Sequence, residues 1–331
     1  GNKKYRSLWK KFRDLSLKEY DKTYKRLNVS FDSFSGEAFY EPMLKDTISL
    51  LKKNKLLEES EGALIVNLDK YNLAPCLIQK SDGATIYATR DIAAAIYRKK
   101  EYNFHKNIYV TDNRQNLHFQ QFFKVLELAK LSWAKDCIHI PFGIMKFNDG
   151  IMSTRKGKVI FLEEVLDKSV DKVKKIIKEK NPKLKNKDKI AEQIGIGAII
   201  FWDLSHDRVK DIQFEWDLIL DFSGETGPYI QYTYARASSI LRKAKNKSKP
   251  SYEKLTNPKE AELIKLISDF ESTIENAAQQ YKPSVLAKYL LSIAQRFNEF
   301  YQSCPVLNEE DKSLAKARLN LISKTREILK E

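Results

Sequence analysis

The sequence predicts an α/β region followed by an all-helical region. Between residues 62 and 140, short apolar runs suited to buried strands alternate with stretches of helical periodicity. From residue 190 onward, almost all apolar residues recur at helical spacing. The length of 331 residues suits two domains of roughly 100 to 200 residues each.

The first predicted elements are helical. Residues 1–30 are dense in Lys, Arg and Glu around spaced Leu, Trp and Tyr, which is typical of one or two amphipathic helices. After a turn-rich stretch, residues 41–58 predict another helix, with Leu44, Ile48 and Leu51 on one face.

The middle of the chain alternates between strands and helices. Apolar runs predict strands at residues 63–66, 107–110 and 137–140, and helical patterns lie between them at residues 91–101 and 117–131. This order with short connections is typical of a parallel sheet wound with helices. About half of a doubly wound domain is therefore expected.

The second half is expected to form a helical bundle. Residues 171–189 contain nine lysines and predict either a solvated helix face or a loop. Beyond them, apolar stripes mark successive helices, which we interpret as core positions without a cofactor. Prolines stand where these helices should begin or end, at Pro250, Pro258, Pro283 and Pro305.

Charge and cysteine content limit the function classes. Lys and Arg total 59 against 44 Asp and Glu, a formal charge of +15. This charge favours a polyanionic partner, because neutralised phosphates release counterions, although it can also serve solubility alone. The spacing of Cys76, Cys137 and Cys304 excludes a paired-cysteine zinc or redox site, and the four histidines show no metal spacing. Three free thiols suggest a reducing cytosol. No apolar run approaches the ~20 residues that cross a bilayer.

Two polar segments follow predicted strands. Residues 81–91 predict a turn, a strand and a helix start, with Tyr87 at the sheet rim and Asp91 in the first helical turn. Ligands of wound sheets bind at that edge, but Asp91 could equally be a helix cap. Residues 112–118 can line the same pocket or form a solvated loop.

Two further segments suit phosphate or RNA. Residues 150–158 form a basic, glycine-bounded loop whose cations can reach phosphate oxygens, although its spacing differs from a Walker-type P-loop. Residues 224–236 bring three tyrosines, a glutamine and an arginine to a helix start. Stacking faces beside cations suit single-stranded RNA, but such tyrosines can also be core residues.

Taken in order, these segments resemble the class I arginyl-tRNA synthetases. The resemblance runs from about residue 30 to residue 330, and it is the ordered set that is specific. It implies a partial Rossmann-like α/β fold, the second half of a class I catalytic domain, followed by an all-α anticodon-binding helical bundle. The matching segments are Phe31–Glu37, Ser81–Gly83, Tyr87–Asp91, Gln115–Phe119, Met152–Gly157, Gly227–Tyr232 and Lys316–Leu319.

The resemblance assigns Tyr87, Asp91 and Gln115 to the arginine substrate. A guanidinium is a planar fork of donors, and a carboxylate can accept two of them while a phenol and an amide accept others. Lysine would leave part of this set unpaired, which is how such sites discriminate.

The resemblance also implies catalytic roles for Met152, Ser153, Arg155 and Lys156. Their loop resembles the Lys-Met-Ser-Lys-Ser signature that class I enzymes place over ATP phosphates, but here both signature lysines are missing. The implied reaction is attack of the arginine carboxylate on the α-phosphate of ATP, followed by acyl transfer to tRNA. Charge stabilisation of the phosphates, aided by Mg²⁺, would support it.

The helical half resembles an anticodon-binding domain, which assigns Tyr229, Tyr232 and Arg236 to tRNA. The implied partners are tRNA(Arg), arginine and ATP with Mg²⁺; zinc and a membrane are not expected, and a monomer is. The expected domains are the C-terminal part of a catalytic domain, largely helical over its first 60 residues, a helical connection with the basic segment, and an anticodon-binding domain, at 1–160, 161–225 and 226–331.

Two alternatives stay open. The first is a non-catalytic tRNA-binding paralogue of a class I synthetase, although such a binder need not retain Tyr87, Asp91 and Gln115. The second is a class I synthetase for cysteine or glutamine. An acidic Asp91 beside Tyr87 favours a cationic substrate instead.

The His-x-Gly-His signature, on which class I enzymes bind ATP, does not occur in the 331 residues. We therefore interpret the chain as a C-terminal fragment of a longer ATP-dependent ligase. Alone, it is expected to form no arginyl-adenylate, because half of the ATP site is missing. Arginine-dependent ATP–pyrophosphate exchange measures this, and robust exchange by the isolated chain would contradict it.

Overall fold

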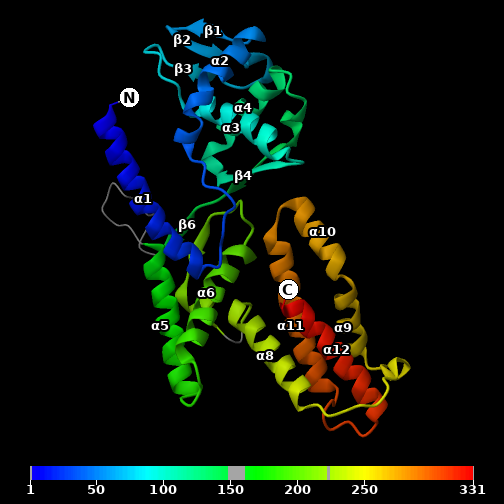
Figure 1. Cartoon of the computed structure of the whole chain (residues 1–331). Helices are drawn as coiled ribbons and strands as arrows, with labels where there is room; N and C mark the ends of the chain where they lie inside the picture. Colours follow the sequence, from blue (N-terminus) through cyan, green and yellow to red (C-terminus); the bar gives the residue numbers. More distant parts are fainter. Residues whose placement is uncertain (1, 148–160, 222–223, 331) are drawn as a thin grey trace. The chain divides into compact units, whose positions relative to one another are not determined.

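The computed structural model describes residues 2–147, 161–221 and 224–330. The chain forms two compact units (Figure 1). Unit 1 comprises residues 1–30, 145–208 and 212–331, and unit 2 comprises residues 31–144 and 209–211. These units differ from the three predicted domains, whose boundaries follow residues 160 and 225. The predicted domain boundaries stay a prediction.

Unit 2 contains two small sheets. An antiparallel sheet consists of β1 (Glu58–Ser60), β2 (Ala63–Val66) and β3 (Cys76–Gln79), in that order. Separately, β4 (Asn107–Asp112) and β5 (Cys137–Phe142) form a parallel pair.

The prediction that residues 63–66 belong to the parallel sheet is wrong. Glu61 and Gly62 both have positive φ, 51° and 77°, and they join β1 directly to β2 with Ser60 opposite Ala63. A two-residue turn with two positive φ values matches the twist of paired antiparallel strands. This hairpin makes β1 and β2 antiparallel, and β3 also pairs antiparallel with β2, so this sheet contains no crossover helix.

The helices of unit 2 are α2 (Leu44–Lys53), α3 (Tyr87–Tyr102) and α4 (Asn116–Leu128). The helix predicted at 41–58 is shorter, because Pro42 lies in a separate 3-10 turn and Lys55 adopts φ 56°. The 3-10 turns of the chain are Glu37–Phe39, Glu41–Met43, Asp69–Tyr71, Asn113–Gln115, Ser132–Asp136 and Tyr252–Lys254.

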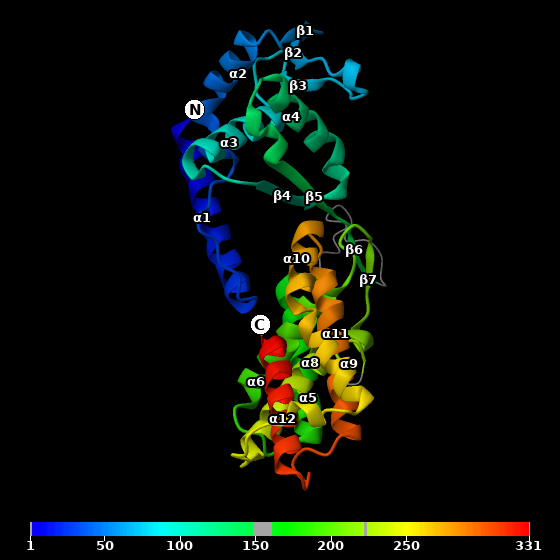
Figure 2. The same cartoon turned by 90° about the vertical axis from the view of Figure 1, so that its right-hand side faces the viewer.

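The core of unit 2 is formed by residues of α2, α3 and α4 together with both sheets, and Figure 2 shows α3 and α4 between the two sheets. The ring of Tyr109 on β4 lies 5.2 Å from that of Phe119 and 5.5 Å from that of Phe122, both on α4. From α3, the guanidinium of Arg98 lies 5.3 Å from the centre of the Tyr109 ring. This aromatic cluster fixes both helices against β4.

Unit 1 is mostly helical. Its only described strands, β6 and β7, form a parallel pair, and no described helix of the chain is long and apolar enough to cross a membrane. The elements of unit 1 are α1 (Lys3–Arg26), β6 (Met145–Phe147), α5 (Leu162–Lys180), α6 (Lys187–Ser205), β7 (Ile212–Phe214), α7 (Trp216–Ile219), α8 (Gly227–Lys243), α9 (Pro258–Ser268), α10 (Phe270–Gln280), α11 (Pro283–Ser303) and α12 (Lys312–Lys330).

The lysine-rich segment 171–189 comprises the end of α5, a turn and the start of α6. Helices α5 and α6 pack closely against each other. A Cβ on Gly195 would lie 2.9 Å from the backbone nitrogen of Val170, and the hydroxyl of Ser169 donates to the Gly195 carbonyl at 2.9 Å. The end of α1 is held to the same pair, since Arg26 contacts Asp167 at 2.8 Å and Glu192 at 2.9 Å.

A buried ion pair joins helices of the C-terminal bundle. The Arg318 guanidinium on α12 contacts the Glu260 carboxylate on α9 at 2.6 Å, with side-chain exposures of 9% and 0%. It also donates to the carbonyl of Pro305 and to Glu309, both at 2.7 Å. Three acceptors therefore compensate one buried cation.

We predict that Arg318→Met lowers the free energy of unfolding by about 3–5 kcal/mol, because Glu260 would stay buried without its partner. The double variant Arg318→Met with Glu260→Leu should recover part of this loss. Urea unfolding followed by circular dichroism measures both. Lys324→Met is the control, because its ion pair with Glu327 is exposed, and an Arg318→Met midpoint equal to that of this control would contradict the prediction.

Candidate functional site

The start of α3 positions the first candidate residues. A turn precedes it, in which Gly83 adopts φ 80° and its amide donates to the Lys80 carbonyl at 2.9 Å. The predicted strand in this segment is reduced to a single bridge between Gln79 and Thr85. The buried Thr89 hydroxyl donates to the Ile78 carbonyl and so ties the first helical turn to β3.

The start of α4 positions the second group. The Asp112 carboxylate at the end of β4 accepts from the Arg114 amide at 2.8 Å and pairs with the Arg114 guanidinium, which lowers the pKa of Asp112. Gln115, next in this turn, is exposed. His118 lies in the first turn of α4 and is only 10% exposed.

The two helix starts meet through a hydrogen bond. His118 Nε2 lies 2.7 Å from Asp91 Oδ2, and the Tyr87 ring stands edge-on to the His118 ring at 4.7 Å. Asp91 is therefore no helix cap: Ile86 occupies the cap position, and Asp91 is the fifth residue of α3. The Asp91 side chain keeps 36% of its surface exposed, and Tyr87 keeps 56%.

The structure thus brings together two of the three predicted arginine contacts. Among the described residues, Gln115 makes no hydrogen bond with Tyr87 or Asp91, although it precedes His118 by only three positions. No role was predicted for His118 itself from the sequence. The sequence feature that could have indicated His118 is its position three residues after Gln115, at the start of a helix that follows a strand.

A second histidine lies behind His118. The His139 ring on β5 stacks on Phe119 at 4.2 Å, and its Nε2 lies 2.8 Å from the Thr111 hydroxyl. Burial, and to a smaller extent the nearby His118, lowers the pKa of His139, which keeps its imidazole neutral at pH 7. His139 is therefore part of the packed support of the cluster.

The described part of the chain contains neither an exposed cysteine nor a cluster of metal ligands that would indicate a second functional site. Cys76, Cys137 and Cys304 are free and buried. Burial raises the pKa of Cys76 to about 12 and that of Cys137 to about 11, so these thiols stay protonated. No three His, Cys, Asp or Glu side chains gather as metal ligands among the described residues.

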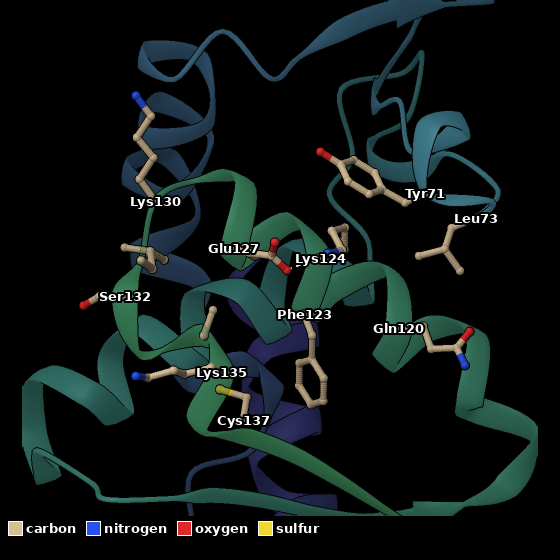
Figure 3. Close-up of a pocket in the computed structure, with 12 residues that line it drawn as sticks. Tyr71, Leu73, Gln120, Phe123, Lys124, Glu127, Lys130, Ser132, Lys135 and Cys137 are labelled. Carbon is tan, nitrogen blue, oxygen red and sulfur yellow. Dashed lines mark hydrogen bonds and ion pairs between the residues drawn. The ribbon is translucent and has the colours of Figure 1, made fainter.

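A cavity of about 910 Å³ lies between α4, the turn after it and the loop around Tyr71 (Figure 3). Lys124 contacts Glu127 at 2.6 Å and lies 4.7 Å from the centre of the Tyr71 ring. None of the predicted site residues lines this cavity. The predicted catalytic residues Met152, Ser153, Arg155 and Lys156 lie outside the described residues.

The predicted tRNA contacts lie on α8, which begins after the Thr226 cap. The Tyr229 hydroxyl accepts from Asn298 Nδ2 at 2.9 Å, and Arg236 donates to Asn298 Oδ1 at 3.0 Å. Asn298 on α11 therefore ties both residues into the bundle. Tyr232, by contrast, is 56% exposed.

Comparison with known proteins decides the family. Residues 1–216 match the catalytic domain of tRNA synthetases class I (R), and residues 230–331 match the DALR anticodon binding domain. The chain belongs to the class I arginyl-tRNA synthetases. The predicted fold class is confirmed, since Rossmann-like α/β parts of a class I synthetase catalytic domain precede a helical DALR domain.

Relatives of this arginyl-tRNA synthetase family are considerably longer than the chain. A Clostridium botulinum (strain Alaska E43 / Type E3) protein named arginine--tRNA ligase is 50% identical over 100% of the chain, which covers 59% of that protein. Arginyl-tRNA synthetase structures from Plasmodium falciparum and Thermus thermophilus match with TM-scores of 0.85 and 0.84 and identities of 29% and 26%. They match 100% and 93% of the chain, which covers 57% and 59% of them.

Proposed function

We propose that the protein to which this chain belongs is an arginine–tRNA ligase. It attaches arginine to tRNA(Arg) through an arginyl-adenylate formed at the expense of ATP. Within it, the described part of this chain recognises the amino acid in unit 2 and the tRNA in unit 1. A cytoplasmic location and a monomeric state stay predictions.

The Asp91 carboxylate carries the amino-acid part of the proposal. It lies beside the Tyr87 ring system at the start of α3, keeps one of its oxygens free of hydrogen bonds within the described residues, and remains 36% exposed. A guanidinium can approach this free side and place two N–H donors on the carboxylate. Gln115 would complete the set from the turn before α4.

ATP is the expected second substrate of this family. The basic loop with Met152, Ser153, Arg155 and Lys156 is proposed to approach its phosphates, because cations and backbone amides suit phosphate oxygens. Mg²⁺ is proposed to arrive as part of the ATP complex. We assign it no protein ligand.

Tyr232 carries the tRNA part of the proposal. An exposed tyrosine on a helix offers a face on which a base can stack. Tyr229 and Arg236 flank it on α8, and their hydrogen bonds to Asn298 tie this part of α8 to α11. The net charge of +15 supports attraction of a polyanion.

We predict that Asp91→Asn weakens arginine binding by about tenfold to a hundredfold, because a charge-assisted hydrogen bond becomes a neutral one. Titration of the chain with arginine, followed by NMR, measures the dissociation constant. Glu127→Gln, at the far end of α4, removes a carboxylate as a control and should leave it unchanged. Equal arginine affinity in wild type and Asp91→Asn would exclude Asp91 as the guanidinium acceptor.

We predict that Tyr232→Ala weakens binding of tRNA(Arg) by about tenfold without changing stability, because it removes one stacking face. Tyr252→Ala is the matched control, since Tyr252 is equally exposed at 56% but lies outside the α8 segment. Filter binding at fixed salt and thermal unfolding measure the two properties. Unchanged tRNA affinity would refute the assignment of Tyr232.

Tyr229→Ala should behave differently from Tyr232→Ala. It removes the hydroxyl that accepts from Asn298 and a ring that packs against Ile230, Leu291 and Ala294. We therefore expect a lower unfolding temperature for Tyr229→Ala, whatever its effect on tRNA. An unfolding temperature equal to that of wild type would show that this contact contributes nothing.

A further inference from the structure

We infer that His118 is a positioning residue for arginine recognition, which sets the plane of the Asp91 carboxylate so that it matches a guanidinium. This inference rests on the proposed function, because it concerns the same amino-acid site. His118 is not placed to touch the substrate itself: only 10% of its side chain is exposed, and its hydrogen bond is made to Asp91.

The ring of His118 has little freedom to move. It lies 5.8 Å from Phe122 at an interplanar angle of 21°, and 5.2 Å from Phe119 at 65°. On the third side, Tyr87 stands edge-on at 4.7 Å. Because Phe119 and Phe122 also pack on Tyr109 of β4, the direction of the His118 Nε2–H bond is fixed by the core of unit 2.

The carboxylate of Asp91 needs such a support. The terminal torsion of an aspartate is broad, so an unsupported carboxylate rotates among many orientations. An ionised carboxylate is only an acceptor, so the proton between Asp91 Oδ2 and His118 belongs to Nε2. This single bond defines the carboxylate plane and occupies one of its roughly four lone-pair positions.

A fixed plane distinguishes arginine from lysine. The guanidinium is a rigid planar fork, and its two parallel hydrogen bonds require the carboxylate to lie in the same plane. An ammonium is a compact point charge that accepts many approach directions. Loss of the His118 donor should therefore weaken arginine binding and leave lysine binding nearly unchanged.

Two substitutions at one position separate the donor from the packing. His118→Phe keeps an aromatic ring against Phe119 and Phe122 but has no donor. His118→Gln loses the ring but places an amide N–H near the position of Nε2. His139→Phe is the matched control, because His139 stacks on the same Phe119 and bonds to Thr111 rather than to Asp91.

The experiment titrates the wild-type chain and the three variants with arginine and with lysine, followed by NMR, and records thermal unfolding. We expect His118→Phe to lose about tenfold in arginine affinity, the size of one charge-assisted hydrogen bond, and to lose nothing for lysine. His118→Gln should recover most of the arginine affinity, and His139→Phe should keep the arginine-to-lysine ratio of wild type. A merely structural role would change the unfolding temperature without changing that ratio.

Nitrogen-15 shifts of the His118 ring test the geometry without any substrate, since they report which ring nitrogen carries the proton. A neutral ring protonated only on Nδ1 overturns the inference. Equal arginine affinity in wild type and His118→Phe also overturns the inference, and so does an equal loss of affinity in His118→Gln and His118→Phe. In both cases the proposed function stands. If the wild-type chain binds no arginine, the amino-acid part of the proposed function fails, and this inference fails with it.

Discussion

In unit 2, the parallel pairing of β4 with β5 requires the chain to cross over through α4, because two parallel strands cannot be joined by a tight turn. Tyr109 on β4 packs against Phe119 and Phe122 of this crossover helix. The guanidinium of Arg98 on α3 lies over the same Tyr109 ring. The starts of α3 and α4 consequently lie together. The contact between Asp91 and His118 depends on this arrangement, and so does the candidate arginine site.

A comparable constraint operates in the helical bundle of unit 1. Arg318 joins α12 to α9 through a buried carboxylate, and Asn298 joins α11 to α8 through Tyr229 and Arg236. The Arg318–Glu260 pair is buried, and its burial is tolerated because every partner is in place, whereas the half-buried Asn298 bonds to a tyrosine and an arginine of the neighbouring helix. Helix α8 therefore presents the exposed Tyr232 from a surface that side-chain bonds hold in position.

The sequence predicted the elements with strong periodicity and missed those set by local turns. Helices such as α4 and α11 carry long apolar stripes, so their existence followed from spacing alone. The hairpin of β1 and β2 depends on positive φ at Glu61 and Gly62, and glutamate is a weak signal for such a turn. Residues 63–66, which form β2, were therefore wrongly predicted to belong to the parallel sheet.

The sequence by itself predicted the family and the fold class, and it proposed residue types for arginine and tRNA, because ordered motifs and periodicity are properties of the linear chain. Only the tertiary structure decided which side chains support one another. Asp91 looked like a possible helix cap, yet its carboxylate meets a histidine 27 positions away. Tyr229 and Tyr232 looked alike, yet one is bonded into the bundle and the other is exposed. Such differences arise from contacts through space, which the packing of one helix on another creates and which no spacing within a segment encodes.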